Sequence, residues 1–350
     1  MPRLSATACV SVLALMVAAP GIAAPAYDFD RKELEAILDD LVAWLPGEWS
    51  SYPQIYHERA VRVPAEGEHD DWYRTFARID APQIGEYVFY GQINIGGRDG
   101  PLMSRSQVLY KAEIDMVRQR VLVRGQTPKN PEQYVNLQDH PQLWHEVEMR
   151  DPAQIHCDFL WHRNGTQIVG VLDGPTDERR KFGPGTCNYT SAQTNSEFMA
   201  DAEWVLSPDE LWLYDINVMG GQQFIGRKDR THIRLYRARP YRCEVSDARG
   251  KRSVDANDRG YAAEATGVDS KQIDWQLLRA RFAAADGSGL DEQLRLIVAT
   301  PAAMKRSPSG AADELDHATA APAAAAIKLD SHGVRIDCRL ADKFPPMPAD

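Results

Sequence analysis

The 350-residue sequence lacks the local patterns that mark several common enzyme classes. No Gly-x-Ser-x-Gly, His-Glu-x-x-His or phosphate-binding-loop pattern occurs, so nothing local predicts a serine hydrolase, a zinc peptidase or a nucleotide enzyme. Positive charge is also in deficit, with 40 Lys and Arg against 50 Asp and Glu. A formal charge of −10 repels polyphosphate, which argues against nucleic acid as a partner.

Metal-binding spacings are missing as well. No Cys-x-x-Cys pair exists, and His140, His145, His156 and His162 lie close in sequence without the spacing of a zinc site. Residues 255–266 faintly resemble a calcium loop, but two of its ligand positions carry residues that cannot serve. The sequence therefore predicts no metal site.

No stretch is long and apolar enough to cross a bilayer, which takes about 20 residues. The N-terminus has instead a short basic start, an apolar run over 10–19 and small residues at Ala23 and Ala24, which together form a secretory signal. The sequence thus predicts a signal peptide over 1–24 and export across the inner membrane to the periplasm. Cys9 precedes the apolar run, so no lipid anchor is expected. The alternative is a buried N-terminal helix.

Removal of this signal leaves four of the five cysteines: Cys157, Cys187, Cys243 and Cys338. An even number in an exported protein favours two disulfides, and four cysteines allow three pairings. We expect Cys157–Cys187 and Cys243–Cys338, because the first two cysteines lie within one predicted domain. The alternative is four free, buried thiols.

The pattern of apolar residues divides the chain. Residues 30–45 carry apolar side chains at three- and four-residue steps, which predicts an amphipathic helix capped by Asp30 and stopped at Pro46-Gly47. From about residue 56 to 237 the period is two, interrupted by a long loop over 126–155 in which one short helix is expected near 141–146. The predicted strands are 86–95, 106–114, 116–124, 156–162, 166–172, 197–206, 210–218 and 231–238.

Many short strands joined by tight turns indicate a mainly β, antiparallel meander over the predicted domain 28–243. Such a meander protects its edges by closing into a barrel or splitting into a sandwich, and hairpin-like connections favour the barrel. Residues 244–350 are interpreted as a C-terminal extension. Within it, 273–283 and 291–299 look helical, and the Ala- and Pro-rich segment 302–326 reads as a linker before a last strand.

Arginine on one predicted strand suggests a binding surface. Arg118 and Arg120 occupy alternate positions, which is the ordinary pattern of a strand with one buried face and one face in water. The alternative is that these guanidinium groups border a barrel mouth and bind carboxylates. Together with Tyr90, Gln92 and Trp161, such a mouth would suit a flat, acidic, conjugated ligand.

Several short segments, taken in order, resemble the CpcT/CpeT family of phycobiliprotein chromophore lyases. They are LVAWLPGEWSSYPQ (41–54), VFYGQI (88–93), VRQRVL (117–122), IHCDFLWHRNGTQIVG (155–170) followed by Cys187, and GRKDRTHIRLYR (226–237). The resemblance covers about residues 30–240. It implies a lipocalin-like (calycin) barrel, often dimeric, that cradles a linear tetrapyrrole and attaches it to a cysteine of an acceptor protein through a thioether.

By position, Gln92, Arg118 and Arg120 carry over as site residues, whereas Gly91 stands where the family has Glu. The resemblance implies no resident cofactor other than a bilin held as ligand. It also leaves two further functions open. The barrel could bind a small amphiphilic ligand without a covalent step, which the absent Glu favours. It could also serve as a structural or partner-binding envelope protein.

Overall fold

The computed structural model describes residues 30–104, 106–150, 157–173, 186–190, 196–227, 229, 231–284, 287–306 and 315–347. The predicted signal peptide and His156 lie outside these residues. Within them, every helix is too short or too polar to span a bilayer. The protein is mainly β, with an N-terminal helix and a closed antiparallel barrel, as expected of a calycin-like fold.

The first part of the chain forms the barrel and its attached elements. Its elements are α1 (Arg31–Trp44), β1 (Gly47–Ser50), α2 (Tyr52–Ala60), η1 (Ala65–Gly67), β2 (Trp72–Ile79), β3 (Tyr87–Ile95), β4 (Val108–Asp115), β5 (Arg120–Gln126), η2 (Pro131–Tyr134), η3 (Leu137–Asp139), η4 (Pro141–Leu143), β6 (Asp158–Asn164), β7 (Gln167–Asp173), β8 (Thr186–Thr190), β9 (Glu197–Leu206), β10 (Glu210–Met219), β11 (Gln222–Ile225) and β12 (Ile233–Arg237). The predicted strands are confirmed within a few residues, and β1, β2, β8, β11 and helix α2 were not predicted.

The barrel closes through β10. Its ten strands follow the order β10-β12-β1-β2-β3-β4-β5-β6-β7-β9, and β9 pairs again with β10. All pairings are antiparallel, and β8 extends the wall beside β9 where the β7 pairing ends. Closure leaves no free edge among these ten strands, which is the usual protection of a long meander. The predicted barrel, rather than a sandwich, is therefore confirmed.

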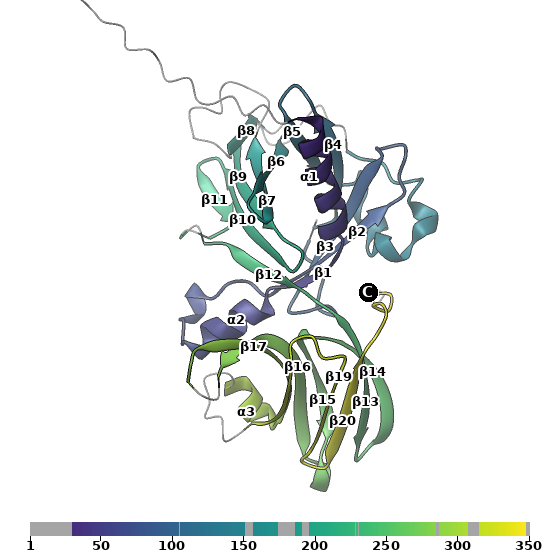
Figure 1. Cartoon of the computed structure of the whole chain (residues 1–350), viewed down its shortest axis with the longest axis vertical. Coiled ribbons are helices and arrows are strands. Elements are labelled where there is room, and N and C mark those ends of the chain that lie inside the picture. Colours follow the sequence, from purple (N-terminus) through teal and green to yellow (C-terminus); the bar gives the residue numbers. More distant parts are fainter. Residues whose placement is uncertain are drawn as a thin grey trace, which may run out of the picture.

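Helix α1 packs on the barrel strands β4 to β7 (Figure 1). The carboxylate of Asp30 accepts the Glu33 N–H at 2.8 Å, so the predicted N-cap is confirmed. The apolar side of the helix, which includes the fully buried Leu34, Ile37 and Leu41, joins the inward-facing side chains of the barrel in one core. This core occupies the α1 side of the barrel.

The C-terminal part of the chain is a second β structure. Its elements are β13 (Pro240–Asp247), β14 (Gly250–Asn257), β15 (Arg259–Thr266), η7 (Val268–Ser270), β16 (Gln272–Ala283), β17 (Leu290–Ala299), α3 (Pro301–Arg306), β18 (Asp316–Ala320), β19 (Ala326–Ser331) and β20 (Val334–Leu340). They form two four-stranded sheets, β14-β13-β20-β19 and β15-β16-β17-β18, around a separate core below the barrel (Figure 1).

The helices predicted at 273–283 and 291–299 are wrong, because both segments are strands. Along β16, Trp275 and Leu277 face the core between the two sheets, while Leu278 and Phe282 face helix α2. A strand buried on both faces has apolar residues in a continuous run, which periodicity does not separate from a helix.

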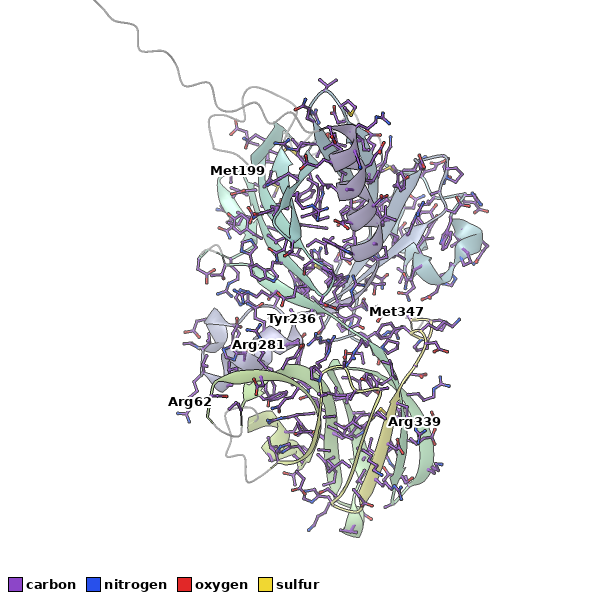
Figure 2. All side chains as sticks on the ribbon, viewed as in Figure 1. Arg62, Met199, Tyr236, Arg281, Arg339 and Met347 are labelled. Atoms are coloured by element: carbon purple, nitrogen blue, oxygen red, sulfur yellow. A yellow bond between two sulfur atoms is a disulfide. The ribbon has the colours of Figure 1, made fainter. Side chains whose placement is uncertain are left out.

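The barrel and the C-terminal sheets meet at an arginine-rich junction. Asp258 is fully buried and accepts hydrogen bonds from the Arg239 backbone and guanidinium at 2.8 and 2.7 Å, and Arg279 pairs with it at 2.8 Å. The carbonyl of Arg237 accepts from Arg259 and Arg279. Figure 2 shows Tyr236 of the barrel and Arg281 of β16 at the same junction.

Both predicted disulfides, Cys157–Cys187 and Cys243–Cys338, are confirmed. The first ties the start of β6 to β8 in the barrel wall. The second joins directly paired residues of β13 and β20, and both of its cysteines are fully buried. Reduction requires a thiolate to reach one of the two sulfur atoms. We therefore expect the partly exposed Cys157–Cys187 bond to react with a reductant more readily than the buried Cys243–Cys338 bond.

This difference predicts an order of reduction. Dithiothreitol applied to the native protein, followed by alkylation, is expected to label Cys157 and Cys187, since Cys157 is partly exposed. Cys243 and Cys338 are expected to react only after denaturant is added. Peptide mass spectrometry reads out both pairs, and labelling of Cys243 before Cys157 would contradict the assignment.

Candidate functional site

The residues predicted to bind ligand do not share one surface. Tyr90 and Gln92 are buried on the outer face of β3, beneath the segment 131–149. The Tyr90 hydroxyl lies 2.8 Å from Gln92 Oε1 and 2.7 Å from the Tyr134 carbonyl oxygen, and its single proton is donated to one of these two acceptors. Gln92 Nε2 donates to Asn136 Oδ1 at 2.7 Å. These two side chains hold the covering segment on the barrel.

The two arginines also lie outside the barrel. Arg118, in the β4–β5 turn, pairs with Asp115 and with Asp158, the latter at 3.4 Å. Arg120 donates to the Gln119 carbonyl at 2.7 Å. The expected arrangement, with these arginines, Tyr90 and Gln92 around one mouth, is therefore not the one observed.

Trp161 alone among the five points into the barrel. It is 1% exposed, and its ring lies 6.4 Å from that of Trp204 in an edge-to-face arrangement. A Cβ atom on Gly170 would come within 2.5 Å of the Trp161 ring, so the glycine makes room for it. Its indole N–H has no acceptor among the described residues.

The interior contains a charged group that the sequence interpretation missed. Arg74 on β2 is 8% exposed, and directly paired Trp49 and Ile93 place it on the inward face. Its guanidinium carbon lies 5.3 Å from the ring centre of Trp72 and 5.5 Å from that of Trp204. Aromatic faces thus supply much of its electrostatic stabilisation.

Arg74 is incompletely satisfied. Its Nε has no hydrogen-bond acceptor among the described residues, and the same holds for the indole N–H of neighbouring Trp72. Burial lowers the pKa of Arg74, and the Tyr110 hydroxyl and the Asp215 carboxylate oppose that effect. A buried cation with an unused donor costs free energy, which is a reason to look for a missing acceptor.

Asp215 on β10 is the carboxylate that faces this cluster. It pairs across the sheet with buried Ala202, and its Oδ1 accepts from Asn217 Nδ2 at 2.8 Å. Burial raises the pKa of Asp215 to about 6, although Arg74 acts in the opposite direction. Asp215 and Arg74 influence each other but form no ion pair within 4.0 Å. Arg74 therefore keeps unused hydrogen-bonding capacity inside the barrel.

Gly91, the position of the family glutamate, also faces inward. A Cβ there would lie 3.0 Å from the Phe76 ring and 3.1 Å from the Tyr110 ring. The two rings stand 5.9 Å apart across this glycine. Aromatic side chains from the neighbouring strands thus fill the space that an acid would need.

The cluster around Arg74 could have been suspected from the sequence. Arg74 has Trp72 and Phe76 two residues away on either side, which places a cation on an aromatic face of any strand. Metal binding has no such support, because the described part of the chain brings no three His, Cys, Asp or Glu residues together in a suitable group. No family model matches the sequence, and no curated protein matches it.

The unmet donors predict that this pair of charges costs stability. The double substitution R74M/D215N is expected to stabilise the protein by about 1–4 kcal/mol at pH 8, because apolar or neutral groups replace poorly paired buried charges. Burial raises the pKa of Asp215, so the wild-type protein loses stability as Asp215 ionises with the pH rising through about 6. The stabilisation by the double substitution is therefore expected to be smaller at pH 5 than at pH 8. Urea denaturation at pH 5 and pH 8 measures the free energy of unfolding of both proteins.

Arg259 offers the matched control for this prediction. It is 3% exposed, but it donates to the Arg237 carbonyl at 3.1 Å and pairs with Glu292 at 3.3 Å. R259M is expected to destabilise the protein by about 3 kcal/mol, because it removes the hydrogen bond to the Arg237 carbonyl and the ion pair with Glu292. If R74M/D215N lowered the free energy of unfolding by as much as R259M, the prediction would be wrong, and Arg74 would be stabilised by its surroundings as well as Arg259 is.

Proposed function

We propose that the barrel binds a small, flat ligand that carries a carboxylate, of the linear-tetrapyrrole class, and that it does so without a covalent step. One observation carries the proposal: Arg74 is buried among aromatic rings with its Nε unused. A carboxylate is the natural partner of a guanidinium, since two parallel N–H groups match its two oxygens.

The surrounding side chains suit the rest of such a ligand. The indole N–H groups of Trp72 and Trp161 are further donors without acceptors among the described residues. The rings of Phe76, Tyr110 and Trp204 lie within 6 Å of one another and form an apolar, aromatic surrounding for Arg74. A conjugated, acidic molecule complements both features, because it stacks on rings while its acid group pairs with Arg74.

The tetrapyrrole class itself comes from the sequence resemblance described above. Two disulfides fit an oxidising compartment, and we place the protein in the periplasm on the strength of its predicted signal. Among the residues expected to contact a bilin, Trp161 keeps that role in this proposal. Tyr90 and Gln92 act instead on the loop that they anchor.

Titration with biliverdin tests the proposal directly. The wild-type protein is expected to shift and sharpen the visible absorbance of biliverdin on binding. R74Q is expected to weaken binding by about 10- to 100-fold, because a charge-assisted hydrogen bond to a carboxylate is lost. R118Q is the matched control, since it removes the same charge from the outer face and is expected to bind as the wild type does.

Two results would contradict this proposal. Wild-type protein that leaves the biliverdin spectrum unchanged would remove the ligand class. Equal affinities of R74Q and wild type, with weakened binding by R118Q, would move the site to the outer surface. In that case the carboxylate contact would belong to the arginines first inferred from the strand pattern.

The absence of a covalent step gives a separate prediction. The four cysteines that follow the predicted signal form two disulfides and so offer no thiol, and Gly91 supplies no acid beside the ligand. After incubation with biliverdin and a cysteine-containing acceptor peptide, all pigment is expected to separate from both under denaturing conditions. Zinc-stained gels and mass spectrometry of the peptide measure this. A thioether on the peptide, absent without the protein, would instead establish the lyase reaction.

A further inference from the structure

Arg74 and Asp215 are opposite charges that face the same interior without touching. Asp215 Oδ1 accepts from Asn217 Nδ2 at 2.8 Å, and Arg74 Nε has no acceptor among the described residues. The Arg74 guanidinium carbon lies 5.5 Å from the ring centre of Trp204, and Trp204 pairs with Leu213, two residues before Asp215 on the same face of β10. The two charges therefore share one side of the interior, and each alters the pKa of the other. Asp215 is thus a counter-ion of Arg74 that does not contact it.

An anionic ligand on Arg74 changes the situation of Asp215. The ligand brings a second negative charge to a buried site that holds one cation. Two anions that share one cation in a buried site cannot both stay ionised at low cost, and the weaker acid takes up a proton.

We infer that an anionic ligand enters the barrel together with one proton, which Asp215 takes up, so that the affinity for the ligand rises as the pH falls. This inference rests on the proposed function, because it needs the ligand's anion at Arg74. It adds the regulation of that site by pH.

The charged and titratable groups around Asp215 indicate that Asp215 itself takes up the proton. Tyr110 on β4 stays neutral, because burial raises the pKa of its hydroxyl. Asp201 on β9 adds negative charge near Asp215, which strengthens its tendency to bind a proton, and its own carboxylate accepts from Tyr214 at 3.0 Å. Arg74 on β2 stays charged, and Asn217 does not titrate.

The direction of the effect follows from the two states of Asp215. When Asp215 is protonated, the charge of Arg74 is fully available to the ligand. When Asp215 is ionised, it competes for Arg74 and repels the anion. Burial already raises the pKa of Asp215 to about 6, so the change falls between pH 5 and pH 8.

The experiment uses 1-anilinonaphthalene-8-sulfonate, an aromatic anion whose sulfonate stays ionised over this range. Titration calorimetry at pH 7, in two buffers with different ionisation enthalpies, counts the protons taken up per probe bound. The wild type is expected to take up most of one proton and to bind at least tenfold more tightly at pH 5 than at pH 8. D215N is expected to take up none and to bind equally at both pH values.

Control variants separate this inference from the function on which it rests. D209N removes an exposed carboxylate from the β9–β10 turn and is expected to behave as the wild type does. Loss of binding in R74Q, together with no proton uptake by the wild type, would overturn the inference and leave the proposed function standing. Wild-type affinity in R74Q would overturn the proposed function. Full proton uptake by D215N would assign the proton to another group and overturn the inference.

Discussion

Closure of the sheet through β10 is the constraint from which the interior chemistry follows. Because β10 pairs with β9 on one side and β12 on the other, the inward side chains are enclosed by a continuous wall. Helix α1 adds its apolar face to the same core. A polar group that points inward must then find its partner inside or remain unsatisfied, as Arg74 and Trp72 do.

The outer face of the barrel near β3 is buried as well, which explains the placement of the expected site residues. The segment 131–149 covers this face, and the C-terminal residues return to it, with the Met347 N–H bonded to Asp139 (Figure 2). Tyr90 and Gln92 are polar side chains in this second interface. Tyr90 and Gln92 are two residues apart on β3, which correctly predicts that they share one face of the strand. This spacing does not show whether that face points into the barrel or away from it.

The sequence alone predicted the structure correctly wherever a local pattern is typical of a single structural environment. The helix at 30–45, most barrel strands and both disulfides were predicted, because each rests on a one-sided apolar stripe, a period of two or cysteine count. It was insufficient where both faces of a strand are buried. The strand β16 then resembled a helix, and β2, which carries Arg74, was not recognised at all.

Two buried charge clusters in this chain show how a structural arginine differs from Arg74. At the junction, Asp258 accepts two hydrogen bonds from Arg239 and forms an ion pair with Arg279 at 2.8 Å, so opposite charges meet within the protein. Around Arg74 the carboxylate of Asp215 stays out of contact, and aromatic rings surround the cation. The same fold can therefore bring a carboxylate into contact with a buried arginine, and the lack of such a contact at Arg74 is the strongest reason to assign that place to a ligand's anion.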